Sequence, residues 1–160
     1  QGGTVLFDTR DQYSTGFDAN STSAATRRLR EILSTMNVPP LEPVPQDHVL
    51  TKTFFIMPDF PGRYAGSPLW VEASLEASNT ENRPVRSGDG VTPIMITGND
   101  FAGAWALDGS GAPMFPTVPA DPMQRIYAYR AGVNIMMYML TGNYKSDQVH
   151  VPALLERLGQ

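Results

Sequence analysis

A short apolar run behind a pair of glycines, at the beginning of the chain, most constrains its fold. Residues 4–7 (Thr-Val-Leu-Phe) lead directly to three charged residues, Asp8, Arg10 and Asp11. An unbroken apolar run of this length predicts a strand buried on both faces, as in parallel sheets. Because open parallel sheets bind ligands beyond the carboxyl ends of their strands, the three charged residues mark a candidate binding site.

A second run has the same organisation. Residues 91–97 predict a buried strand, and Asn99 and Asp100 follow it after one glycine. The carboxyl ends of parallel neighbours meet at one edge of a sheet. We therefore expect Asp8 and Asp11 to lie close to Asn99 and Asp100.

Two further segments have the apolar spacing of helices. The first begins at a cap formed by Ser21 or Ser23 and presents one apolar face. The second, residues 123–140, is apolar around most of its circumference. We expect it to be largely buried, with Val133 and Met137 almost fully covered, and to end at the Gly-Asn pair that follows.

The remaining segments carry weaker signals. Residues 53–57 are β-branched and aromatic and predict a strand, and residues 69–73 predict a short edge strand. Residues 79–90 have almost no apolar content and predict an exposed, mobile loop. Residues 152–158 predict a last short helix. Together these elements predict an α/β domain in three layers that spans residues 1–160.

The composition excludes several classes of protein. A net charge of −4 without a basic stripe argues against nucleic-acid binding. The chain has no cysteine, which excludes thiol nucleophiles, disulfides and thiolate metal sites. No segment approaches the ~18 apolar residues of a membrane-spanning helix, so we expect no direct membrane insertion by this segment.

Four stretches together resemble one bacterial family, that of domain of unknown function 4159. These are GGTVLFDTRD, VPQDHVL, ITGNDFAGAWALD and the C-terminal block AYRAGVNIMMYMLTGNYKSDQVHVPALLERLG. The resemblance covers nearly the whole chain. It implies a flavodoxin-like, class I glutamine-amidotransferase-like fold, nearest to the trehalose-utilisation (ThuA) branch. A Gly-Gly strand, a His-Pro-Ile-like segment and a Gly-His-Asp-like strand end recur in that branch, and here they read Gly2-Gly3, His48-Val49-Leu50 and Gly98-Asn99-Asp100.

The resemblance also carries expectations about function. True amidotransferases need a cysteine nucleophile, which this chain lacks, and Asn99 stands where the related pattern has histidine. The first strands and helices of the fold are expected upstream of Gln1. Family members are often part of a larger envelope protein with transmembrane helices. This implies a soluble domain attached to a membrane protein of the bacterial cell envelope, with a protein partner there.

Each candidate residue of the sheet edge has a functional and a structural interpretation. Asp8 and Asp11 could hold a cation or bind sugar hydroxyls. Alternatively, Asp8 caps a turn and Arg10 pairs with Asp11. Asn99 and Asp100 are likewise common turn formers.

Three further candidates lie outside these strand ends. His48 could act as a base or ligand, or simply bond to backbone. Trp105 could stack on a sugar ring, or belong to the core. Arg130 lies within an apolar helix, so we expect it to pair with Asp8 or Asp100.

Two functions remain open. The first is a non-catalytic module that binds a partner protein or a small polar ligand. Its pocket would need no metal and no cofactor, because Arg10 and Arg130 offset the carboxylates. The alternative is a hydrolase or sugar-modifying enzyme that uses Asp8, Asp11, His48 and Asp100, with a divalent metal. The two differ in whether these four side chains line one cleft.

Overall fold

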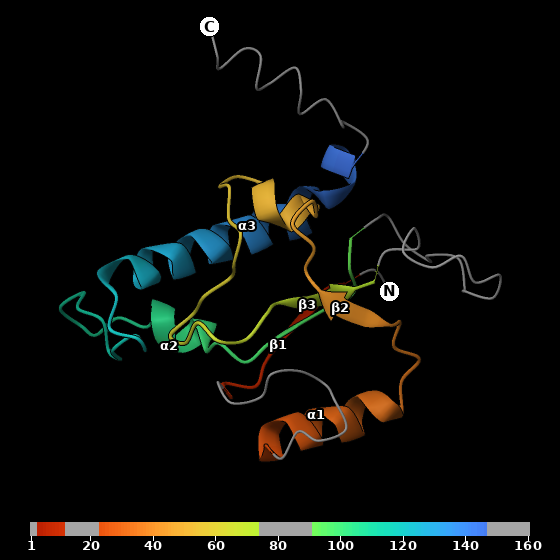
Figure 1. Ribbon diagram of the computed structural model, residues 1–160, viewed down its shortest axis with the longest axis horizontal. Helices are drawn as coiled ribbons and strands as arrows, with labels where there is room; N and C mark the ends of the chain where they lie inside the picture. Colours follow the sequence, from red (N-terminus) through yellow and green to blue (C-terminus); the bar gives the residue numbers. More distant parts are fainter. Residues whose placement is uncertain (1–2, 12–22, 74–90, 147–160) are drawn as a thin grey trace, which may run out of the picture.

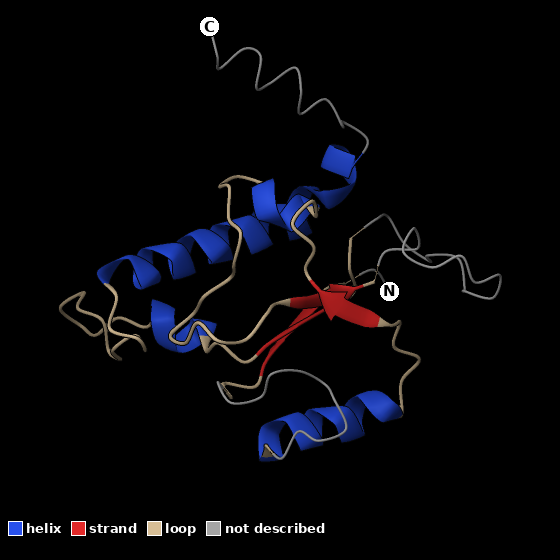
Figure 2. Ribbon diagram, viewed as in Figure 1, coloured by secondary structure: helices blue, strands red, loops and turns tan. Residues whose placement is uncertain are grey.

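Helices cover both faces of a mixed four-stranded sheet (Figures 1 and 2). The computed structural model describes residues 3–11, 23–73 and 91–146. The described strands are β1 (Val5–Asp8), β2 (Leu41–Pro43), β3 (Trp70–Glu72) and β4 (Ile94–Thr97), in the spatial order β1-β4-β3-β2. The described helices are α1 (Ala24–Ser34), the 3₁₀ helix η1 (Val49–Lys52), α2 (Phe101–Trp105) and α3 (Pro122–Ser146).

The pairing of the two strongest predicted strands is confirmed. β1 and β4 are parallel neighbours, in register from Val5 opposite Ile94 to Asp8 opposite Thr97. β3 runs antiparallel to both β4 and β2. Every residue of β4 is buried, whereas Val5 of β1 is 48% exposed. The prediction of a strand buried on both faces is therefore confirmed for β4. It is wrong for β1, because β1 is an edge strand of the described sheet.

The two faces of β4 pack against different layers. Ile94 and Ile96 lie in one apolar cluster with Leu29 and Leu33 of α1. Met95, which points to the opposite face, lies in the second cluster with residues of η1, α2 and α3. This alternation produces three layers, with α1 on one side of the sheet and α3 on the other (Figure 1).

Helix α1 begins as predicted. The Ser23 hydroxyl accepts a hydrogen bond from the Thr26 N–H at 3.2 Å and caps the first turn. Leu29 and Leu33 are buried on the sheet, but Ile32 and Met36 are exposed. The buried face of α1 is thus narrower than its apolar face.

Helix α3 differs from the prediction in two ways. It continues to Ser146, beyond the Gly-Asn pair expected to end it. Val133 is 39% exposed and Met137 is only half-buried, so their predicted burial is wrong. The helix packs on the molecule by one face, and the apolar side chains of the opposite face point away from the sheet. The residues buried on the packed face are Gln124, Ala128, Ala131, Asn134, Ile135 and Tyr138.

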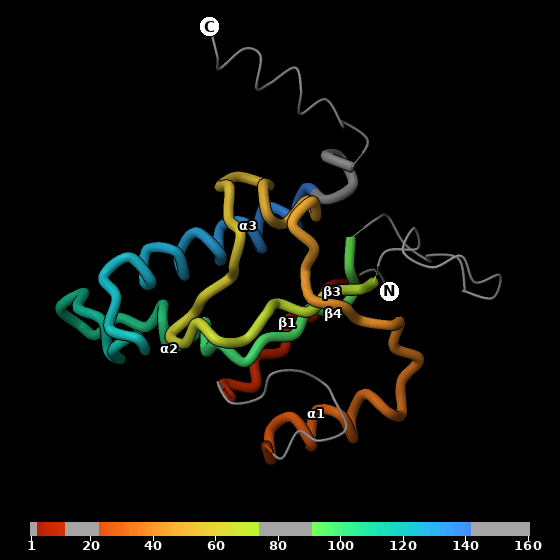
Figure 3. The backbone as a smooth tube through the Cα atoms, in the orientation of Figure 1, coloured from red at the N-terminus to blue at the C-terminus, as the bar shows by residue number. Residues whose placement is uncertain are grey.

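The strand predicted at residues 53–57 is absent, because local and long-range side-chain bonds take its place. The Thr51 and Thr53 hydroxyls donate to carbonyls three and four residues back, which stabilises η1 and the turn after it. The Asn134 side chain then accepts from the Phe55 N–H and donates to the Phe55 and Leu50 carbonyls, all at 2.8 Å. Figure 3 traces this excursion from β2 to α3 and back to β3.

The other sequence predictions have separate outcomes. The strand within residues 69–73 is present as β3, but it lies between β2 and β4 rather than at an edge. The predicted loop 79–90 and helix 152–158 lie outside the described residues. In the part of the chain that the structure describes, no helix is long and apolar enough to cross a membrane.

The Asn134 contacts predict a large effect of one substitution. Asn134→Ala leaves the buried Phe55 N–H and two carbonyls without partners, at a cost of about 1–3 kcal/mol for each unsatisfied group. We expect the free energy of unfolding, measured by urea denaturation, to fall by several kcal/mol. Val133→Ala, one position away on the exposed face, is the matched control and should change it by less than about 1 kcal/mol. Similar losses in both variants would contradict the role given to Asn134.

Candidate functional site

The Asp8 carboxylate joins the end of β1 to the turn that follows β4. Its Oδ1 accepts hydrogen bonds from the backbone N–H groups of Asp100 and Arg10, both at 3.1 Å. Its Oδ2 accepts from the Phe101 N–H at 2.6 Å. Burial raises the pKa of Asp8 above its usual value of 3.8, and these three backbone bonds oppose that rise. The carboxylate therefore serves as a structural bridge at this edge of the sheet.

Asp100 occupies a sharp turn between β4 and α2. Its backbone is left-handed, with φ 56°, and its Oδ1 caps α2 by accepting from the Gly103 N–H at 3.1 Å. A Cβ at position 103 would lie 2.3 Å from Asp100 Oδ2, so a larger residue there would displace the capping carboxylate. The Arg63 guanidinium lies 3.7 Å from Oδ2 and offsets its charge.

Asn99 is 1% exposed, and its side chain holds the loop that precedes β3. Oδ1 accepts from the Ser67 N–H at 2.9 Å, while Nδ2 donates to the carbonyls of Phe60 and Ser67. Its backbone carbonyl accepts from the Tyr64 N–H. These partners give Asn99 a structural role.

The structure brings the predicted residues of the two strand ends together. Asp8 bonds directly to the backbone of Asp100. The Asp11 carbonyl lies so close to Gly98 that a Cβ there would be 2.6 Å away. Arg10 is exposed beside them, in a left-handed conformation with φ 54°.

His48 does not join this group. Its Nδ1 accepts from the Leu50 N–H at 3.2 Å and caps η1. Its ring lies 5.6 Å from the ring of Tyr138, whose hydroxyl accepts from the Thr92 N–H near the beginning of β4. Asp100 follows the other end of that strand. The four residues of the predicted enzyme therefore do not line one cleft.

Trp105 and Arg130 are also placed apart from the carboxylates. The Trp105 ring stacks on Phe101 at 5.4 Å, and its indole N–H donates to the Ala128 carbonyl at 2.8 Å. The Arg130 guanidinium lies 5.1 Å from the centre of the Phe55 ring, a cation–π contact. The predicted pairing of Arg130 with Asp8 or Asp100 is wrong, because Arg63 takes that position at Asp100.

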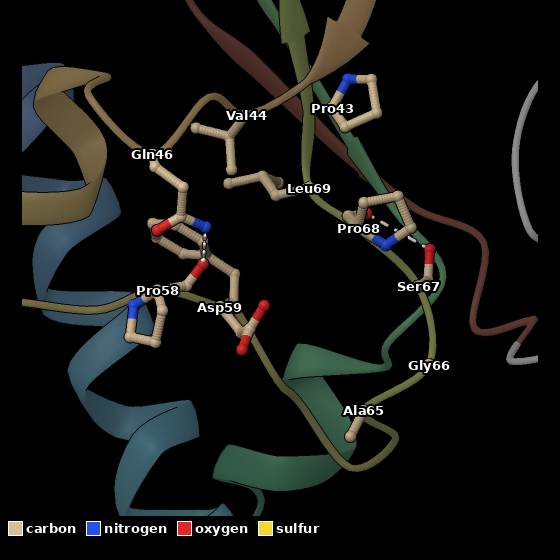
Figure 4. A pocket seen from close by; sticks show the side chains of 11 residues that line it. Pro43, Val44, Gln46, Pro58, Asp59, Ala65, Gly66, Ser67, Pro68 and Leu69 are labelled. Carbon is tan, nitrogen blue, oxygen red and sulfur yellow. Dashed lines mark hydrogen bonds between the residues drawn. The ribbon is translucent and has the colours of Figure 1, made fainter.

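A groove lies beside this sheet edge. It has a volume of about 340 Å³ and is formed by three segments, residues 43–46, 58–60 and 65–69. Figure 4 shows the Asp59 carboxylate pointing into it, with Gln46 on the left side and Ser67 on the right side. The Gln46 side chain donates to the Pro58 carbonyl at 3.1 Å and ties two walls together. Pro43, Val44, Pro58, Phe60, Pro68 and Leu69 belong to the rest of the lining, and polar and apolar atoms share the surface of the groove about equally.

The groove is joined to the sheet edge through Ser67. Ser67 Oγ accepts from the Gly98 N–H at 3.2 Å, and its backbone bonds to the Asn99 side chain. The sequence interpretation missed Arg63, Asp59 and Gln46. For Asp59 and Arg63 the signal is the Gly and Pro residues of segment 58–67, which indicate a loop but not which side chains it presents.

The described residues contain no group of three His, Asp or Glu side chains placed to hold a metal ion. At the sheet edge, the carboxylate oxygens of Asp8 accept from backbone N–H groups, and those of Asp100 face the Gly103 N–H and Arg63. These contacts favour a structural role for both carboxylates.

Comparison with known proteins identifies the family of the chain. The family model of a domain of unknown function (DUF4159) matches residues 1–140. No curated protein matches the chain.

The raised pKa of Asp8 predicts a pH dependence of stability. The folded protein binds the Asp8 proton more tightly than the unfolded chain does, so protonation of Asp8 stabilises the fold. This stabilisation is fully present below pH 3.8. It is lost as the pH rises through the higher folded-state value. The unfolding free energy of the wild type, minus that of Asp8→Asn, should therefore fall as urea denaturation is repeated from pH 3.5 to pH 7. A difference that rises over this range would show that the pKa of Asp8 is lowered instead.

Proposed function

Because the chain belongs to the DUF4159 family, to which no reaction is assigned, we propose its function from its own geometry: it is a non-catalytic binding module. Its groove holds a small polar ligand that carries a positive charge. The observation on which this rests is the Asp59 carboxylate, the one charged side chain among the residues that line the groove.

The groove has the properties of a small-ligand site. Its volume of about 340 Å³ falls at the lower end of the usual range for such sites. Its lining is mixed, with polar and apolar surface in about equal parts, and Asp59, Gln46 and Ser67 are among the polar groups. Asp59 is exposed, so its carboxylate is available to a ligand at little cost in desolvation. A primary amine or guanidinium on a short apolar stem complements this lining.

The sheet edge supports the non-catalytic part of the proposal. In hydrolases with a nucleophile at a strand-to-helix turn, that side chain projects from the turn toward the substrate. Asp100 occupies such a turn, but its carboxylate is directed to the Gly103 N–H and Arg63. His48, which the alternative enzyme needs as a base, contacts Tyr138 near the opposite end of β4. We therefore do not propose a hydrolase or sugar-modifying enzyme.

Two finer parts of the proposal rest on the family resemblance. We propose an amidotransferase-like fold, which the three layers, the parallel β1–β4 pair and the β4–α2 turn support. We also propose that the module belongs to a larger, membrane-anchored protein of the bacterial envelope and meets its partner there.

Asp59→Asn tests the groove. We expect isothermal titration of the wild type with N-acetyl-lysine amide and N-acetyl-arginine amide to give binding, and N-acetyl-glutamate amide to give none. The variant should bind the cationic probes at least about tenfold more weakly, because it lacks the charge that faces the ligand. Glu31→Gln, on the exposed face of α1, is the matched control for the loss of one negative charge and should bind like the wild type.

Other results would contradict the proposal. Equal binding by the wild type and Asp59→Asn would exclude a carboxylate-directed site. Micromolar binding of Mg²⁺, Ca²⁺, Mn²⁺ or Zn²⁺ that disappears in Asp8→Ala or Asp100→Ala would favour metal-dependent chemistry at the sheet edge.

A further inference from the structure

Helix α3 carries an apolar stripe on the side turned away from the sheet. The stripe consists of Ile126, Tyr129, Val133, Met136 and Leu140. Their exposed fractions range from 39% for Tyr129 and Val133 to 74% for Leu140. A helix that is apolar on both sides is normally covered on both sides. Isolated exposed apolar side chains are ordinary, but a continuous stripe of them marks an interaction surface.

The spacing of the stripe indicates what kind of structure fits it. Successive members are three, four, three and four residues apart, which is the pattern of a coiled-coil seam. At about 100° per residue they fall within one narrow sector, opposite the buried residues Ala131 and Ile135. The complementary surface is therefore the apolar seam of another helix.

The charges beside the stripe indicate the chemistry of that helix. Arg125 and Arg130 flank the first two members, at the positions that select partners in coiled coils. Arg125 donates to the backbone carbonyls of Ala104 and Phe115, and Arg130 lies over Phe55. Among the described residues, neither arginine lies within ion-pair distance of a carboxylate. From residue 122 to residue 140 the helix has no Asp or Glu.

We propose that the outer stripe of α3 docks an amphipathic helix of a partner protein, whose apolar seam is flanked by acidic side chains where it meets Arg125 and Arg130. A second copy of this chain would bring the same arginines and no carboxylate from α3. Electrostatic complementarity therefore favours a different partner over self-association. This surface lies apart from the groove residues, and the inference does not depend on the groove.

Two designed peptides of three heptads test the proposal. Both have leucine at the a and d positions; one has glutamate and the other lysine at the flanking e and g positions. We expect fluorescence anisotropy with the whole chain to show at least about tenfold tighter binding of the glutamate peptide, with a preference that weakens at high salt. Val133→Asp, in the middle of the stripe, should abolish binding of both peptides. Arg130→Glu leaves Arg125 as the single flanking cation beside one carboxylate and should therefore remove the preference.

Control variants separate docking from folding. Ile32→Asp introduces the same charge at a 44% exposed position of α1, across the sheet, and should leave peptide binding unchanged. Val133→Asp should retain the circular dichroism spectrum and melting temperature of the wild type to within a few degrees, because Val133 lies outside the core.

Three outcomes would overturn the proposal. The first is equal affinity for the two peptides. The second is binding to Val133→Asp as tight as to the wild type. The third is a wild-type dimer in sedimentation that Val133→Asp disperses, together with no peptide binding, which would make a second copy the occupant.

Discussion

The buried carboxamide of Asn99 is the contact on which this end of the molecule depends. It sits just beyond the central strand β4 and bonds to the backbone at both ends of one loop, at Phe60 and at Ser67. That loop supplies one wall of the groove and also carries Arg63 to the Asp100 carboxylate. A neutral amide, which donates and accepts at once, satisfies all these backbone groups without placing a charge in the core. A histidine side chain could not make the same set of bonds.

The acidic residues of the sheet edge divide between structure and recognition according to their surroundings. Asp8 and Asp100 are buried or half-buried, and their carboxyl oxygens accept backbone hydrogen bonds that hold the β4–α2 turn in place. Asp59 is exposed, in a groove whose lining is about equally polar and apolar. The proposed ligand site is thus displaced from the place where open α/β sheets usually bind, because the groups there already hold the fold together.

Local signals in the sequence predicted the parts of the fold that local interactions determine. The Ser23 cap and the strands ahead of Asp8 and Asp100 followed from spacing and turn chemistry. The strand expected at residues 53–57 fails because its backbone is bonded by Asn134, about eighty residues away in the chain. The strand propensity of residues 53–57 carries no information about such a long-range contact.

Other differences arose where the pattern itself was ambiguous. Helix α3 is apolar all round, so periodicity could not indicate which face meets the sheet, and Val133 was assigned to the wrong side. The sheet edge was located correctly, but its arginine partner was not. Arg63 reaches Asp100 through a Gly/Pro-rich loop whose path depends on tertiary contacts rather than on sequence spacing.

The pairing of β1 with β4 also has a kinetic consequence. Thr4 and Thr9 of the first strand region bond to Thr92 and Thr97, each 88 residues later in the chain. Strand β4 is therefore synthesised last among the four strands of the described sheet, and β1 and β3 cannot pair with it before then. Such long-range closure slows folding, because the entropy of a large loop is lost before any contact compensates for it. Helix α1 and the β2–β3 pair can form early, but the layered core assembles only when β4 joins the sheet.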